Sequence, residues 1–200
     1  MDMQTFWNEA YKEDPDQVEI TDVILDEELQ TRPAGTALDL GCGAGSNALN
    51  LAQKGWTVTG VDWAEHAIKL AKKAAHEKGL NATFYVDDIT SWDPPTQFDL
   101  VISMYALPGG EDNKRVLQTA VKALAPGGTL IVAEWDKSMT EVWGFGEDEL
   151  LSPAQITDLL PGLEIEKAEV RHLKNIFSDN DMQASAGNTA NVAFVRARKR

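Results

Sequence analysis

A buried strand that runs into three alternate glycines, and then into an amphipathic helix, constrains this chain more than any other feature. The stretch reads TALDLGCGAGSNALNLA and begins at Thr36, with Gly41, Gly43 and Gly45 after the apolar run. From Ser46 onward, apolar residues fall at helical spacing. Glycine permits positive φ and lets a ligand approach the backbone closely. At a strand-to-helix junction, such a turn predicts the binding crevice of an open α/β sheet.

Strand-like and helix-like segments alternate along the rest of the chain. Further strands are predicted over 57–62, 82–88, 98–103, 128–134, 164–173 and 191–199. Helices are predicted over 64–79, from 111 to a stop at 126–128, and after a Ser152 cap with Pro153 at the first position. This pattern favours an α/β fold with a Rossmann-like, doubly wound sheet of about seven strands, mostly parallel with an antiparallel edge hairpin. The polar segment 174–190 is expected to be a mobile loop.

Composition and charge exclude several classes of function. The chain has 200 residues, 43% of them hydrophobic, which suits one domain with its own core. Its net charge is −14, whereas nucleic-acid binding needs clustered Lys and Arg. The apolar runs are too short to span a membrane, and the N-terminus lacks the order of a secretory signal. A single cysteine, Cys42, excludes a disulfide framework, and no residue spacing indicates a metal site. We expect a cytoplasmic protein that acts on a small molecule.

The spacing of the glycines distinguishes between ligands. A dinucleotide motif G-x-G-x-x-G that starts at Gly41 would need glycine at position 46, which is Ser46. Asp39 precedes the first glycine by two residues and would repel a pyrophosphate, but it suits an ammonium or sulfonium group. The pattern therefore favours an adenosyl ligand that carries an amino acid. Asp62, at the end of the second strand, is placed to accept hydrogen bonds from ribose hydroxyls.

Five ordered motifs carry a resemblance to a known family. The segments LDLGCGAGSNALNLA, VTGVDWAEHAIKLA, VDDIT, FDLVIS and LAPGGTLIVAE resemble those of class I S-adenosylmethionine-dependent methyltransferases over roughly residues 36–136. The resemblance implies S-adenosyl-L-methionine as the cofactor. It implies that the methionine part is held by Asp39, Gly41, Cys42, Gly43 and Gly45, and that the ribose is bound by Asp62. It also implies that the adenine lies near Trp63, Asp88 and Ile89, and that Ser103 or Met104 lines the floor of the cofactor site. Cys42 itself is expected to be a small packed residue rather than a nucleophile.

The opening segment FWNEAYKEDP is similar to the N-terminus of the thiopurine and tellurite-resistance methyltransferase-like group. That resemblance implies an aromatic helix that closes over the cofactor. Trp7 and Tyr11 are four residues apart and would share one helical face. The same spacing is also compatible with the core face of an ordinary helix.

The sequence thus predicts one domain, residues 1–200, that transfers a methyl group to a small-molecule acceptor by in-line displacement. Residues 1–35 form an N-terminal helical segment, 36–136 the cofactor-binding core, and 137–200 the sheet edge and acceptor-side loops. No catalytic residue is assigned, and the acceptor atom and oligomeric state stay open. The alternatives are a non-catalytic adenosyl-binding module and, disfavoured by Ser46, a nicotinamide-dependent oxidoreductase. The strand ends on the acceptor side carry Met104, Tyr105, Leu107, Glu134, Trp135, Trp143 and Phe145, of which the last two either form a lid or pin their loop.

Overall fold

The computed structural model describes residues 3–13, 23–143, 146, 149–174 and 189–200. The helices are α1 (Met3–Glu13), α2 (Val23–Leu29), α3 (Ser46–Gln53), α4 (Glu65–Glu77), α5 (Gly110–Ala123), the short 3₁₀ helix η2 (Lys137–Met139), α6 (Thr140–Trp143) and α7 (Pro153–Asp158). The strands are β1 (Thr36–Leu40), β2 (Thr57–Asp62), β3 (Ala82–Val86), β4 (Phe98–Met104), β5 (Leu124–Trp135), β6 (Leu163–Lys174) and β7 (Thr189–Lys199).

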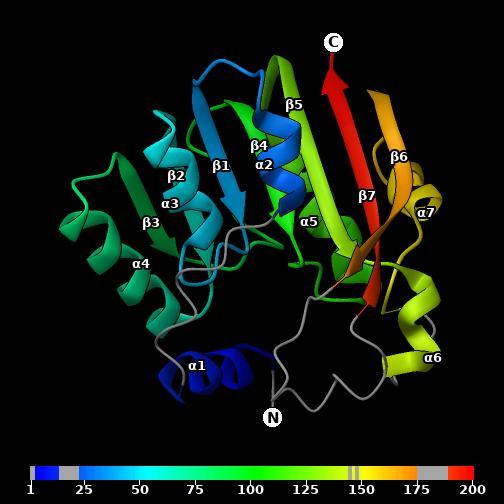
Figure 1. Ribbon diagram of the computed structural model, residues 1–200, viewed down its shortest axis with the longest axis horizontal. Coiled ribbons are helices and arrows are strands. Elements are labelled where there is room, and N and C mark those ends of the chain that lie inside the picture. The colour runs from blue at the N-terminus through cyan, green and yellow to red at the C-terminus, as the bar shows by residue number, and fades with distance from the viewer. Residues whose placement is uncertain (1–2, 14–22, 144–145, 147–148, 175–188) are drawn as a thin grey trace.

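All seven strands join one sheet in the order β3-β2-β1-β4-β5-β7-β6 (Figure 1). Strands β1 to β5 are parallel, whereas β7 lies antiparallel between β5 and β6. The predicted parallel sheet with an antiparallel edge hairpin is therefore confirmed. The strand order reverses between β1 and β4, and ligands of open α/β sheets bind at the carboxyl ends of the strands at such a point.

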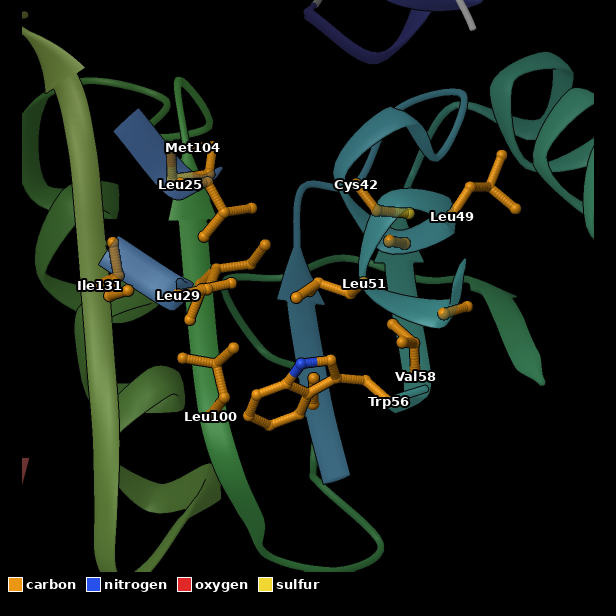
Figure 2. Close-up of a cluster of buried hydrophobic side chains, with 14 of the residues drawn as sticks. Leu25, Leu29, Cys42, Leu49, Leu51, Trp56, Val58, Leu100, Met104 and Ile131 are labelled. Carbon is orange, nitrogen blue, oxygen red and sulfur yellow. The ribbon is translucent and has the colours of Figure 1, made fainter. Parts of the chain in front are cut away.

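Helices cover both faces of the sheet, with α2, α3 and α4 on one face and α5 and α7 on the other (Figure 1). Each face has its own apolar core. Leu25 of α2 and Leu51 of α3 belong to the first core (Figure 2), and Leu117 of α5 belongs to the second. Successive residues of β1 point to opposite faces, so Ala37 enters the first core and Leu38 the second, both fully buried. This explains why the strand sequence is continuously apolar.

An ionic cluster joins α2 to the edge hairpin. The side chain of Glu28 is 4% exposed and accepts hydrogen bonds from Lys167 at 2.9 Å and from Arg171 and Arg196. Burial alone would raise the pKa of Glu28, but the hydrogen bonds from Arg171, Lys167 and Arg196 lower it to about 2. The guanidinium of Arg171 also lies 3.7 Å from the centre of the Phe194 ring. The cluster fixes α2 against two strands that follow it by more than a hundred residues.

Two sequence-predicted boundaries can now be judged. The cap of α7 is confirmed, because Ser152 and Gln155 form a reciprocal capping box with Pro153 at the start of the helix. The predicted start of the fifth strand at residue 128 is too late, since β5 begins at Leu124. Leu124 pairs with Phe98, and the register then shifts before the pairing resumes, which accommodates the Pro and Gly residues that suggested a break. No helix in the described part is long and apolar enough to cross a membrane.

Candidate active site

In the loop between β1 and α3, both the backbone conformation and the packing disfavour a side chain at the glycine positions. Gly41 and Gly43 have φ values of 75° and 52°, in the left-handed region. The N–H of Gly41 donates to the carbonyl of Val61 at 2.8 Å, which ties the loop to β2. A Cβ at Gly41 would lie 2.3 Å from the Cβ of Ala106, and a Cβ at Gly43 would lie 2.3 Å from the hydroxyl oxygen of Tyr11. The loop therefore meets both α1 and the segment after β4.

Two buried carboxylates flank this glycine loop. Asp62, the last residue of β2, is 8% exposed, and its oxygens accept the backbone N–H groups of Gly43 and Ala64, each at 2.8 Å. Asp39, in β1, is 2% exposed, and its Oδ2 has no hydrogen-bond partner in the described part of the chain. Burial and the neighbouring Asp62 raise the pKa of Asp39 to about 7, and burial also raises the pKa of Asp62.

An unpartnered buried carboxylate oxygen is costly and calls for an explanation. A ligand ammonium group would supply both the missing hydrogen-bond partner and the opposite charge. Next to Asp39 lies a loop with glycine at three alternate positions, which lets Ala106 and the Tyr11 hydroxyl approach its backbone closely. The residues present therefore fit the amino-acid end of the predicted cofactor.

Helix α1 lies across the carboxyl edge of the sheet, next to the start of α4 (Figure 1). The side-chain amide of Gln4 donates to the carbonyl of Trp63 at 3.2 Å. The N–H of His66 donates to Oδ1 of Asn8 at 3.3 Å. These two bonds anchor α1 on the turn between β2 and α4, on the side of the predicted adenosine site.

Tyr11 extends from α1 to the glycine loop. Burial raises the pKa of its hydroxyl to about 12, the charge of Asp62 acts in the same direction, and a hydrogen bond with the backbone of Ala44 opposes it. The ring of Trp7 lies 6.1 Å from that of Tyr11, and Trp7 is 37% exposed. The shared face that the sequence predicted is therefore present, with Tyr11 inward against the loop and Trp7 toward solvent.

The turn after β3 also reaches the glycine loop. Ile89 is buried, and its Cδ1 lies 3.5 Å from the position that a Cβ would take at Gly41. Asp88 is exposed and accepts the N–H of Thr90 at 2.8 Å, so it holds the turn in shape. The pair thus offers an apolar wall next to the loop and a carboxylate at its rim.

Three further predicted site residues have less open environments. Sγ of Cys42 lies 2.9 Å from the position that a Cβ would take at Gly60, and burial raises the pKa of its thiol well above the ordinary value. Met104 is buried at the end of β4, beside Leu25 of α2 (Figure 2). Trp63 is half-buried. Cys42 and Met104 belong to the first core, so their side chains contribute mainly packing.

Glu134, which the sequence placed on the acceptor side without a specific role, connects the ends of β4 and β5. Glu134 is 5% exposed, and its two oxygens accept the N–H groups of Leu107, at 3.0 Å, and of Trp135, at 2.8 Å. Burial raises the pKa of Glu134 to about 7. Its place at the end of an apolar strand was the only sequence signal available. Trp143 ends α6, but its side chain and Phe145 lie outside the described part, as does most of the predicted loop 174–190.

No group of three or more His, Cys, Asp or Glu in the described ranges could hold a metal ion. Ser103, the other candidate for the cofactor floor, is 1% exposed, and its Oγ lacks a hydrogen-bond partner within those ranges. The described site therefore consists of carboxylates, backbone amides and aromatic rings.

Comparison with known sequences matches the chain to methyltransferases. A family described as a methyltransferase domain matches residues 32–185. The 2-heptyl-1-hydroxyquinolin-4(1H)-one methyltransferase of Mycobacteroides abscessus is 40% identical over 114 residues, which are 54% of this chain and 50% of that protein. The ubiquinone biosynthesis O-methyltransferase of Coxiella burnetii is 35% identical over 130 residues, 64% of this chain and 55% of that protein. The chain thus spans about half the length of these curated relatives.

Solved structures share the fold over nearly the whole chain. A structure described as converting a disulfide bond into a thioacetal group during echinomycin biosynthesis has a TM-score of 0.78 at 21% identity, and the match covers 99% of this chain and 92% of the other. TehB from Haemophilus influenzae has a TM-score of 0.74 at 16% identity, with 97% and 67% covered. At these identities the likeness is one of fold alone.

Proposed function

We propose that this chain, which belongs to the class I S-adenosylmethionine-dependent methyltransferases, transfers the methyl group of S-adenosyl-L-methionine to a small-molecule acceptor. The observation that carries this proposal is the buried, unpartnered Oδ2 of Asp39 beside a loop with glycine at positions 41, 43 and 45. A cationic amino-acid group satisfies both features, whereas the pyrophosphate of a nicotinamide cofactor would meet a carboxylate there. The adenosyl ligand is therefore favoured over a dinucleotide.

Each part of the cofactor has a candidate partner in the chain. Asp39 and the glycine loop would hold the ammonium end. Asp62 accepts backbone hydrogen bonds from Gly43, Ala64 and Trp63, and its remaining lone pair would take a ribose hydroxyl. Ile89 would contact the adenine, with Asp88 at its edge. Tyr11 would cover the loop from the side of α1.

When bound, S-adenosylmethionine would supply an electrophilic sulfonium methyl group, whose carbon an acceptor lone pair would attack in line as the bond to sulfur breaks and S-adenosylhomocysteine leaves. The contribution of the chain is then to hold the two reactants in contact and to exclude water. Such positioning can supply on the order of 7–11 kcal/mol of the barrier. A general base is needed only for an acceptor that is protonated at neutral pH. We assign none.

The proposed acceptor is a small molecule. The two curated relatives carry the names of a hydroxyquinolinone methyltransferase and of a ubiquinone biosynthesis O-methyltransferase, so both names refer to small organic molecules. The net charge of −14 disfavours a polyanion such as a nucleic acid. We place the acceptor near the carboxyl ends of β4 and β5, and support comes from Ala106, two residues after β4, which packs against Gly41 of the glycine loop.

Thermal unfolding with S-adenosylmethionine, S-adenosylhomocysteine and NADH tests the cofactor class. We expect stabilisation by both adenosyl ligands, by about 2.7 kcal/mol at a hundredfold excess over Kd, and none by NADH. Stabilisation by NADH alone would instead support an oxidoreductase. If S-adenosylhomocysteine binds but no methyl transfer occurs across a panel of phenols, thiols and amines, the chain is an adenosyl-binding module.

A further inference from the structure

We infer that the acceptor is a flat, conjugated ring that stacks on a pair of aromatic side chains, Tyr105 and Trp135. This inference rests on the methyltransferase function proposed above and specifies the class of its substrate. The two rings come from the ends of neighbouring strands, β4 and β5. Their centres are 4.5 Å apart, and their planes are inclined by 34°. Both side chains are half-buried, so part of each remains exposed.

The aromatic pair lies beside the proposed cofactor site. Ala106, the residue after Tyr105, packs against Gly41 so closely that a Cβ at Gly41 would be 2.3 Å from its own. The segment that carries Tyr105 thus borders the glycine loop directly. Strands β4 and β5 end at the same edge of the sheet (Figure 1). A ring on the pair would therefore lie next to the methyl donor.

The backbone at Tyr105 is strained, and the strain sets the position of its ring. Tyr105 has a φ of 55° and is the only non-glycine residue with positive φ in the described part of the chain. For a bulky side chain this conformation is unfavourable, and such strain is concentrated at functional sites. A relaxed backbone at this position would direct the ring elsewhere.

Glu134 holds both members of the pair in place. Its carboxylate accepts the N–H of Trp135 with one oxygen and the N–H of Leu107, two residues after Tyr105, with the other. The N–H of Tyr105 donates to the carbonyl of Ala133 at 2.8 Å. A buried carboxylate and a strained residue are therefore both used to fix one aromatic surface. Both rings also pack against the first core.

A surface of this kind selects for planar molecules. Aromatic rings attract one another in offset or tilted arrangements beyond the effect of buried area alone. A saturated molecule of the same size would bury similar area but would gain no ring-to-ring attraction. The pair therefore favours a conjugated acceptor over an aliphatic alcohol, thiol or amine.

Binding to the full chain saturated with S-adenosylhomocysteine tests this inference. The probes are 1-naphthol, 2-naphthol and naphthalene-1,5-diol, each beside its fully saturated counterpart, which is also uncharged, titrated by calorimetry. We expect at least one planar probe to bind about tenfold more tightly than its counterpart. Equal affinities for all three pairs, or no measurable binding of any planar probe, would overturn the inference. The proposed function would stand in either case, provided that S-adenosylhomocysteine binds.

Two variants test whether Tyr105 and Trp135 cause the preference for planar probes. Tyr105→Asn removes the ring but tolerates positive φ, so it should preserve the loop, and Trp135→Leu removes the other ring. Each should abolish the preference for the planar probe, whereas the affinity for S-adenosylhomocysteine should stay within about twofold of the original. Tyr85→Asn, at an exposed tyrosine on the edge strand β3, is the matched control. If Tyr105→Asn binds the planar probe as the original chain does, the inference is wrong even if Trp135→Leu fails to fold.

Discussion

Asp39 is a buried carboxylate whose protonation we expect to be linked to the binding of the ammonium group of the cofactor. Its pKa of about 7 lies well above the ordinary value of 3.8 because burial and Asp62 both disfavour the charged form. In the free protein, the stabilising effect of this protonation is fully present below about pH 4 and is lost as the pH rises through 7. A ligand ammonium group would favour the charged form instead.

We therefore predict that S-adenosylhomocysteine affinity depends on pH through Asp39. Below pH 7, binding must displace a proton, so the affinity should rise by up to about tenfold per pH unit and level off above 7. Calorimetry between pH 5.5 and 7.5 measures this dependence, and Asp39→Asn should remove it. Asp93→Asn, at an exposed carboxylate paired with Lys122, is the control. An affinity of the original chain that does not change with pH would contradict the assignment.

Asp62 gives a second prediction for a single residue. Asp62→Ala removes the proposed ribose acceptor and three backbone hydrogen bonds, and should weaken S-adenosylhomocysteine binding by about 1–3 kcal/mol. Asp99→Ala is a matched control, because Asp99 also accepts a backbone N–H, that of Thr36, at the opposite end of the sheet. Both variants should lose stability in urea unfolding. Only Asp62→Ala should lose affinity, and an unchanged Kd there would refute the ribose assignment.

Among the elements, α1 is the one that covers the glycine loop. Tyr11→Ala should leave the fold intact and speed the dissociation of S-adenosylhomocysteine by about fivefold, since a cover acts mainly on the off-rate. Stopped-flow displacement measures this rate. Phe6→Ala, at a half-exposed ring on the same helix, should leave it unchanged. Equal rates in the two variants would mean that α1 only packs against the domain.

Helix α2 depends on its ionic cluster with the edge hairpin. Glu28→Gln leaves three cationic side chains without their shared carboxylate and should lower the free energy of unfolding by about 3 kcal/mol. Glu164→Gln, which breaks an exposed pair with Arg200, should cost less than about 1 kcal/mol. The pKa of Glu28 is depressed to about 2, so its stabilising effect is present above pH 4.5 and is lost as the pH falls toward 2. Urea unfolding should show a difference in the free energy of unfolding between the original chain and Glu28→Gln that is smaller at pH 3 than at pH 7.

The elements themselves were largely predictable, because their signals are local. Apolar periodicity and glycine stops located the seven strands and helices α3, α4 and α5, and Ser152 marked the start of α7, whereas α2 was covered only by the prediction of a helical segment over residues 1–35. The start of β5 was misjudged because the pairing of Leu124 with Phe98 is a tertiary contact that outweighs the local preference of Pro126 and Gly127. Strand pairing between distant segments leaves no local pattern to detect.

For the molecule as a whole, the sequence predicted the residues of the candidate site but not the contacts around them. The glycine loop and both carboxylates followed from motif spacing, and the sheet order places them at the switch point. The left-handed backbone of Tyr105 and the Glu28 cluster could not be foreseen. The first depends on packing against Trp135, and the second joins residues 139 to 168 positions apart.

A crystal structure of the chain with S-adenosylhomocysteine tests the central claim most directly. The account predicts the amino group of the ligand within hydrogen-bond distance of Asp39 or the glycine-loop backbone, its ribose at Asp62, and Tyr11 over the loop. A ligand bound elsewhere, or an Oδ2 of Asp39 that accepts a hydrogen bond from a protein group instead, would contradict it.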